Sequence, residues 1–493
     1  MRTYLKGISI LFVITILSLH SQAVTYYWDP ARGSDSNNGS SSKPWKTLDK
    51  IASSVSKGDI VNIKPGTYTK TQMVTSATMK GYGSIFNWTA SHRKGARGYP
   101  ITIQSTPGAT RAVFDGEGKN AYFVFMNTKL TDAGLFVVFK NIDFRRWIHP
   151  VIRIQAKNVA VDGCKFSNTY DNTSAPINML DAQYVIVRNS RFEVTGLLTP
   201  TYNNNADHGI YVAEGSKNVL IENNFFKTVN GFGIHAYGHS DLARITENLI
   251  IRKNIITNVG SSHVVLAGTR YKNVKIYNNT MYSSPNPFPN RSQDETVRSF
   301  DLRAKIFSDV AWQNNISVAY LSWSNFYLDP GITMSTSTIL SNLRMGNNVW
   351  VNLQNKDKTH FWLGKYMNLA AFRSLTQKDT NSISVDPRFQ SASTFDLRLK
   401  SGSPAINTGD FLSTTLTSGS GTTIPLSNVS YFTDGYGLGF GDLIQIGSNL
   451  VRVKSINTSA KTITVDRSIS WTKGQRGSLP YKGSKPDMGA YEY

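Results

Sequence analysis

A short hydrophobic pattern repeats through the middle of the chain. Each copy begins with a polar or aromatic residue, continues with alternating apolar positions, and ends in a polar turn before a new apolar start. Six segments share it: Asn158-VAVDGCKF, Tyr184-VIVRNSRF, Asn218-VLIENNFF, Asn248-LIIRKNII, Asn273-VKIYNNTM and Asp309-VAWQNNIS. Alternation of this kind indicates β-strands. The copies recur at unequal intervals, which predicts stacked coils whose loops differ in length.

The turn residue of each copy falls at one equivalent position. Successive turn positions are 26, 34, 30, 25 and 36 residues apart, and a further echo follows in Met345-GNNVW. The residues at this position are Cys164, Ser190, Asn224, Asn254, Asn279, Asn315 and Asn348. Stacked carboxamides can hydrogen-bond to one another along a ladder inside the turn. We therefore expect an interior asparagine ladder, with Cys164 as a small structural residue and not a catalytic one.

A second short strand precedes each copy of the repeat. These strands are Val151-IRI, Pro176-INML, Gly209-IYV, Gly233-IHA, His263-VVLA and Ser299-FDLR. Two or three strands per coil predict an all-β parallel β-helix. The competing leucine-rich repeat requires a strict LxxLxL pattern, which is absent. Alternation places Ile210 and Val212 inside, so Tyr211, His235 and Tyr237 are expected to point outward from adjacent coils.

Both ends of the chain carry further motifs. The N-terminal one is Tyr26-YWDPARGSDSNNGSSSKPWKTLDKIASSVSKGDIVNIKPGTY, and the C-terminal ones are Val385-DPRF, Phe395-DLRLKSGSPAINTG and Pro486-DMGAYEY. They resemble the opening and closing segments of secreted right-handed parallel β-helix proteins, a superfamily that includes alginate lyases, chondroitinase B and pectate lyases. The resemblance implies a short strand, a helix that caps the open core, and the first coil. The apolar stripe Leu48, Ile51 and Val55 fits that helix.

An insertion separates the last two closing motifs. It contains alternating strands divided by Gly447-Ser448-Asn449 and Asn457-Thr458-Ser459-Ala460, a pattern that predicts a small antiparallel β module. We divide the chain into a signal peptide at 1–23, a β-helix with its N-terminal cap at 24–409, and the module with the closing strand at 410–493.

The first 23 residues have the composition of a secretory signal. Arg2 and Lys6 precede an apolar run from Ile8 to Leu19, and Ser21-Gln22-Ala23 supplies small residues for cleavage. The run is too short to span a bilayer, so we expect no membrane anchor. The sequence predicts export to the periplasm or the extracellular space. The single cysteine excludes an internal disulfide.

The chain is strongly basic, with 53 Lys and Arg against 32 Asp and Glu, a formal charge of +21. Removing the signal with Arg2 and Lys6 leaves about +19 (21 − 2). Such a charge favours an anionic partner, although it also serves solubility alone. No nucleic-acid motif is present, so an acidic polysaccharide is the expected partner of a monomeric protein.

Polar residues concentrate on two successive coils, at Asn203–His208 and His235–Asp241, with Arg270 one coil later. Cleavage of a uronate polymer by β-elimination needs a cation on the carboxylate, a base for the C5 proton, and an acid for the leaving oxygen. We predict His235 as the base, Tyr211 as the acid and Arg270 as the cation, with His208 in support. The expected substrate-binding residues are Tyr237, His239, Lys253 and Asp207.

Purely structural roles for these residues remain open. His208 shares the alternation phase of inward Ile210 and fits a packing role, Tyr211 fits an exposed stacking platform, and Arg270 fits an ordinary loop cation. The calcium-dependent lyases of the superfamily imply a Lys and an Arg on neighbouring coils. Here His235 falls at the arginine position and Glu214 near the lysine. We therefore expect no cofactor; calcium is possible in principle but has no clear site.

Other reaction classes also fit the predicted scaffold. The stretch Gly233–Asp241 is distantly similar to the region around the DPHD motif of mannuronan C5-epimerases but lacks that motif. A glycoside hydrolase needs two opposed carboxylates, for which Asp207, Glu214 and Asp241 are candidates without a convincing pair. A non-catalytic carbohydrate-binding or adhesion protein is the alternative outside enzymology. The sequence favours a lyase, with alginate as the first substrate and a glycosaminoglycan or pectate next.

Overall fold

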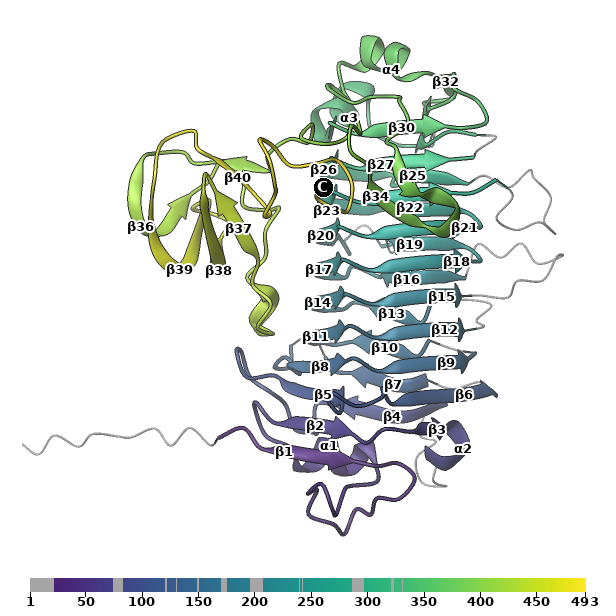
Figure 1. The fold of residues 1–493 in the computed structure, drawn as a ribbon, viewed down its shortest axis with the longest axis vertical. Helices are drawn as coiled ribbons and strands as arrows, with labels where there is room; N and C mark the ends of the chain where they lie inside the picture. The colour runs from purple at the N-terminus through teal and green to yellow at the C-terminus, as the bar shows by residue number, and fades with distance from the viewer. Residues whose placement is uncertain are drawn as a thin grey trace, which may run out of the picture.

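The chain folds as a parallel β-helix. The computed structural model describes residues 22–73, 83–119, 122–129, 131–148, 150–169, 175–195, 207–238, 240–241, 243–285, 297–320, 323–329 and 331–493. Successive coils stack along one axis, and each contributes a strand to sheet C, then to sheet A, then to sheet B (Figure 1). This bears out the all-β fold expected from the repeat.

Sheet A contains Thr25–Trp28 (β1), Ile60–Ile63 (β2), Ile101–Ser105 (β5), Val137–Lys140 (β8), Lys157–Asp162 (β11), Gln183–Arg188 (β14), Lys217–Glu222 (β17), Thr246–Arg252 (β20), Arg270–Tyr277 (β23), Ile306–Gln313 (β26) and Leu343–Gly346 (β29). Sheet B contains Thr67–Thr69 (β3), Val113–Lys119 (β6), Asp143–Trp147 (β9), Lys165–Thr169 (β12), Arg191–Thr195 (β15), Phe225–Val229 (β18), Ile255–Val259 (β21), Thr280–Ser283 (β24), Ile316–Ala319 (β27) and Val349–Asn352 (β30). Sheet C contains Ser84–Thr89 (β4), Tyr122–Asn127 (β7), Ile152–Gln155 (β10), Ile177–Leu180 (β13), His208–Ala213 (β16), Phe232–Tyr237 (β19), Ser262–Ala267 (β22), Arg298–Leu302 (β25), Phe326–Leu328 (β28), His360–Trp362 (β31) and the antiparallel Lys365–Met367 (β32).

The predicted asparagine ladder lies inside the turn between sheets A and B. The side-chain amide of Asn224 donates to Oδ1 of Asn254, that of Asn254 to Asn279, and that of Asn279 to Asn315, each at 3.0 Å. Burial raises the pKa of the Cys164 thiol to about 12. Cys164 is therefore an inert packing residue, as the sequence indicated.

Aromatic stacking continues the core beside this ladder. On sheet B the rings of Phe144, Phe166, Phe192 and Phe226 stack with centroids 5.3, 5.1 and 4.6 Å apart. Because each ring occupies the same inward position of its coil, the strands are held in one register.

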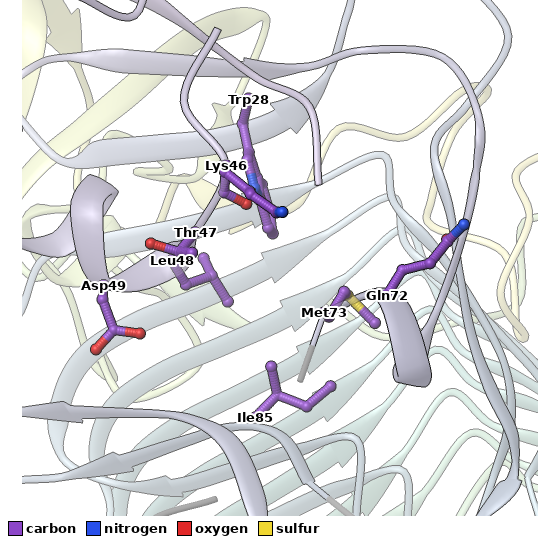
Figure 2. A pocket seen from close by; sticks show the side chains of 8 residues that line it. All are labelled: Trp28, Lys46, Thr47, Leu48, Asp49, Gln72, Met73 and Ile85. Atoms are coloured by element: carbon purple, nitrogen blue, oxygen red, sulfur yellow. The ribbon is translucent and has the colours of Figure 1, made fainter. Parts of the chain in front are cut away.

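Helices close both ends of the core. Leu48–Ser54 (α1) buries Leu48, Ile51 and Ala52, and Leu369–Thr376 (α4) buries Leu369 and Phe372 at the other end. Thr47 and Asn368 cap their first turns. Lys70–Met73 (α2) and Thr336–Asn342 (α3) are the remaining α-helices of the described chain. A small cavity of about 20 Å³ lies between α1 and α2, with room for no more than a water. Figure 2 shows the side chains that line it.

The insertion forms the expected antiparallel module. Its strands are Ser413–Thr414 (β35), Gly419–Pro425 (β36), Leu443–Ile446 (β37), Asn449–Asn457 (β38), Thr462–Trp471 (β39) and Arg476–Ser478 (β40), in the order β35-β40-β37-β38-β39-β36. A hairpin of Phe389–Ser391 (β33) and Asp396–Leu399 (β34), with the short 3₁₀ turns Ala392–Thr394 (η1) and Gly435–Gly437 (η2), completes the described elements.

The module stands beside the stack and covers sheet A (Figure 1). Its apolar face packs on the outward residues Ile186, Leu220 and Ile250. Sheet A is consequently buried on both faces, which explains its continuous apolar runs. The last residues return to the β-helix, where the Gly489 amide donates to the Asn314 carbonyl.

A buried ion pair anchors the module to sheet A. The Arg252 guanidinium donates to both Asp442 oxygens, at 2.8 and 2.5 Å, and to Glu222 at 2.7 Å. Burial opposes the charge of Arg252, but Asp442 and Glu222 nevertheless raise its pKa well above the ordinary value. Arg252 and Asp442 thus join two units that lie 190 residues apart in sequence.

Loss of this pair is expected to destabilise the protein strongly. Asp442→Asn should lower the free energy of unfolding by about 3 kcal/mol, because Arg252 stays buried with only one of its two anionic partners. Urea unfolding monitored by tryptophan fluorescence measures this change. The matched control is Asp396→Asn, which removes an exposed pair with Arg398 and should have little effect, because solvent screens such a pair. Equal effects of the two substitutions would contradict the anchoring role.

Candidate active site

One outward column of sheet C brings the candidate catalytic residues together. Strand register places its members directly above one another on successive coils: Arg153, Asn178, Tyr211, His235, Val265, Asp301 and Tyr327. Tyr211 and His235 are direct neighbours, with ring centroids 5.1 Å apart. The next outward column carries Tyr237 and, two coils on, Arg303. We call Tyr211, His235, Tyr237, Asp301 and Arg303 the sheet C strip.

His235 lies among aromatic rings at the centre of the strip. Its Nδ1 is 2.9 Å from Nε2 of His208, and its ring centroid is 4.8 Å from that of Phe232 and 5.7 Å from that of Tyr237. The side chain is only 9% exposed, whereas Tyr237 is 44% exposed. Nε2 of His235 has no hydrogen-bond partner among the described residues. A buried nitrogen without a partner costs stability, so its retention points to a use.

The protonation states follow from burial. Desolvation lowers the pKa of His235 to about 3; the charge of Arg303 adds to this effect, and that of Asp301 opposes it. Burial also lowers the pKa of His208 well below its ordinary value, reinforced by His235. The pKa of Tyr211 is raised to about 12, mainly by burial. At neutral pH the strip therefore holds a neutral imidazole beside a protonated phenol.

Two guanidinium groups converge on a buried carboxylate in the strip. Asp301 is fully buried and accepts from Arg298 at 2.9 Å and from Arg303 at 2.6 Å. Arg298 lies 3.6 Å above the ring of Tyr327. The Arg303 side chain is 32% exposed, so its guanidinium can meet an anion in solvent while Asp301 fixes its position.

The structure separates some of the other predicted residues from this strip. Arg270 begins β23 of sheet A, pairs there with Ile306 and is exposed, so it lies outside the sheet C column, although its backbone lies beside Gly238, the residue that follows Tyr237. Lys253 occupies the turn between sheets A and B; burial lowers its pKa, and Glu492 opposes that shift. Lys253 is therefore placed away from sheet C. His239 and Asn203–Ala206 lie outside the described residues.

Two further predicted residues are buried behind the strip. His208 is 4% exposed and Asp207 is 1% exposed. Asp207 accepts a hydrogen bond from Asn230 at 2.7 Å. His208 contacts the rings of Tyr211, Phe232 and His235. A Cβ added at Gly209 would instead meet Phe226 in the core, so His208 lies with the strip and not in the inward position that its alternation with Ile210 allowed.

Sequence reasoning missed Asp301 and Arg303. Their strand, Ser299-FDLR, was recognised, and the alternation that turns His235 outward also turns these two residues outward. The sequence signal for these two residues is therefore the alternation of their own strand. Arg303 lies 68 residues after His235 in sequence (303 − 235), while only β22 lies between β19 and β25 in sheet C.

The described residues contain no group of three or more His, Cys, Asp or Glu side chains arranged to hold a metal. Among the same residues, no helix has the length and apolar character needed to cross a membrane.

Residues 126–295 match the family model described as "Right handed beta helix region". This match agrees with the fold of the structure, a right-handed parallel β-helix. No curated protein matches it significantly. A solved rhamnogalacturonan lyase is 16% identical with a TM-score of 0.42, covering 75% of this chain and 91% of that one. The pectate lyase Pel9A is 16% identical with a TM-score of 0.41, covering 96% and 97%. An alginate lyase from Paenibacillus sp. str. FPU-7 is 15% identical with a TM-score of 0.38, covering 70% and 99%.

The neutral state of His235 has a measurable consequence. Its folded-state pKa lies below the ordinary value of about 6.5, so the unfolded chain binds more protons between those two pH values. This contribution to stability is complete above about pH 6.5 and declines as the pH falls toward 3. In NMR spectra the His235 ring protons should not shift between about pH 8 and 5, whereas they titrate near pH 6.5 in urea. A midpoint near 6.5 in the folded protein would contradict the environment described.

Proposed function

We propose that the protein is a polysaccharide lyase that cleaves a uronate-containing polymer by β-elimination at the sheet C strip. The observation that carries this proposal is the neutral, unpartnered Nε2 of His235 beside the protonated phenol of Tyr211. A base and an acid on adjacent coils, with a guanidinium close by, supply the three functions that the reaction needs.

In the proposed reaction Nε2 of His235 removes the proton at C5 of the uronate. The released electron pair forms the C4–C5 double bond, the bond from C4 to the glycosidic oxygen breaks, and Tyr211 protonates that oxygen. The base requires the tautomer in which Nδ1 of His235 donates to Nε2 of His208. His208 is then a positioning residue that orients the imidazole, in keeping with its burial.

Arg303 replaces Arg270 as the residue proposed to neutralise the substrate carboxylate. The positive charge of Arg303 is one of the causes that lower the pKa of His235. When a uronate carboxylate binds Arg303, this effect is offset and Nε2 becomes a stronger base. Substrate binding and activation of the base are therefore coupled through one guanidinium group.

Access to Nε2 requires movement of a covering side chain. The nitrogen is buried, and the exposed Tyr237 ring lies edge-on to the imidazole. We assign Tyr237 to substrate binding: its ring turns aside as the sugar enters and then packs against it. The basic charge of +21 supports an acidic polymer, with alginate proposed first, and the predicted signal supports action outside the cytoplasm. We also propose that the protein acts as a monomer.

The reaction class can be tested with a panel of alginate, pectate and glycosaminoglycans. A lyase forms an unsaturated uronate and raises the ultraviolet absorbance, with or without a chelator. An epimerase would instead change the uronate NMR signals without shortening the chains. A hydrolase would release reducing ends without absorbance, and an adhesion protein would bind without any product. Each of these last three outcomes would reject the proposal.

Substitution of the base and the acid is expected to remove activity. His235→Ala and Tyr211→Phe should each lower kcat by about 10²–10⁴-fold, the usual contribution of general acid–base groups. Tyr320→Phe is the matched control, because Tyr320 is an exposed tyrosine that follows β27 of sheet B. Retained turnover in both catalytic variants, with unchanged folding, would show that the site is wrong.

The two arginines can be separated by their kinetics. Arg303→Gln should raise KM and lower kcat, since it removes the carboxylate contact and leaves Asp301 with fewer partners. Arg303→Lys should recover part of the loss by restoring the charge. Arg270→Gln is expected to behave like the unmodified protein. The reverse pattern, a defect in Arg270→Gln alone, would return the role to Arg270.

A further inference from the structure

A second polar cleft lies between the C-terminal module and sheet A. It consists of two neighbouring cavities of about 460 and 170 Å³. Both are lined by Asn248 and Asn273 from sheet A and by Val429, Ser430 and Thr458 from the module. The larger one falls within the size range of small-ligand sites, about 300–1,000 Å³. The module therefore encloses a binding-sized space on a different sheet from the proposed active site.

A ladder of carboxamides forms the sheet A side of this cleft. The amide of Asn273 donates to Oδ1 of Asn248 at 2.7 Å, and the amide of Asn248 donates to Oδ1 of Asn218 at 2.9 Å. Asn248 uses one N–H and its oxygen in the ladder and keeps a second N–H, whereas Asn273 only donates and Asn218 only accepts. At the end of the ladder, Oδ1 of Asn273 accepts no hydrogen bond from any described residue. The ladder thus offers donors and an acceptor at the spacing of adjacent strands, about 4.8 Å.

The backbone alone does not account for these asparagines. All three adopt a left-handed conformation, which asparagine tolerates well. However, Tyr184 (φ 59°) and Asp309 (φ 52°) hold the same conformation at the equivalent positions of the coils on either side. Other residue types are therefore accepted in this turn, and Tyr184 and Asp309 line the cleft together with the three asparagines.

The charges around the cleft are balanced, unlike those of the whole chain. Three carboxylates line it, and each is paired: Glu247 with Lys272 at 2.9 Å, Asp309 with Lys275 at 2.7 Å, and Asp434 with Arg97 at 3.5 Å. The lining cations are Lys272, Lys461 and Arg97. A site with equal lining charges gives no net attraction to a polyanion, in contrast to the arginines of the sheet C strip.

Aromatic rings close the smaller cavity. Tyr184 of sheet A meets Tyr436 of the module edge-on, with centroids 5.8 Å apart, and Phe432 also lines this end. Aromatic faces beside amides and hydroxyls are suited to a ligand with both C–H and O–H surfaces.

We propose that this cleft binds a neutral oligosaccharide. Sugar hydroxyls pair with the ladder of Asn218, Asn248 and Asn273, and a ring of the sugar packs against Tyr184. The inference does not rest on the reaction proposed for sheet C. It gives the module a binding role in addition to its packing over sheet A.

Isothermal titration of the full chain with neutral hexasaccharides (cellohexaose, xylohexaose and mannohexaose) and with an acidic hexauronate tests the proposal. At least one neutral hexamer should bind, and Asn248→Gly should weaken it about tenfold, the loss of roughly 1.4 kcal/mol. Glycine keeps the left-handed backbone and removes only the amide. Asn273→Gly is a second variant with the same expectation.

Asn223→Gly is the matched control. Asn223 is also left-handed and donates to Asn189 at 2.6 Å, but it lies in an exposed turn and lines neither cavity. It should bind the neutral hexamer as the unmodified chain does. Absence of binding by all neutral hexamers, an equal affinity in Asn248→Gly, or loss of hexauronate binding in that variant would each overturn the proposal. Activity on acidic polymers is a separate readout, so the two sites can fail independently.

Discussion

Direct stacking of successive coils is the constraint on which the rest of the structure depends. Main-chain hydrogen bonds between parallel strands fix which residues lie above one another, and a slip of one residue would turn every outward side chain inward. The buried asparagines and the stacked phenylalanines oppose such a slip, because each makes its contacts in one register only. Tyr211 and His235, 24 residues apart in sequence (235 − 211), are neighbours for this reason.

This regularity explains what could be predicted from the sequence. The repeat gave the fold, the interior ladder and the outward pairing of Tyr211 with His235, since all of them depend on strand alternation alone. The positions of Arg270 and Lys253 relative to sheet C could not be predicted, because Arg270 begins a strand directly after a turn and Lys253 lies in a turn. Strand alternation does not give the direction of a side chain in or after a turn. The Asp301–Arg303 pair was recoverable from its strand. The pKa of His235 was not, because it depends on the rings and charges packed around it.

The module shows how one added unit changes the surface of a β-helix. Arg252 and Asp442 hold it against sheet A. The outward apolar residues of that sheet are therefore buried in a second hydrophobic core, and some of its outward polar residues line the cleft. Sheet C remains the side with the histidines, tyrosines and arginines. The two faces consequently differ in electrostatic character: the sheet C strip carries the partly exposed guanidinium of Arg303, whereas the charged residues that line the cleft under the module are equal in number and opposite in sign. A single register of stacked coils thus supports two distinct surfaces.

The most direct measurement of the central claim is a crystal structure of the His235→Asn variant with an acidic hexasaccharide. The account predicts that the sugar crosses the sheet C strip, with a uronate carboxylate on Arg303, its C5 beside residue 235, and the glycosidic oxygen within hydrogen-bonding distance of the Tyr211 hydroxyl. A hexasaccharide seated on another face of the β-helix, or on the strip with its carboxylate turned away from Arg303, would contradict it.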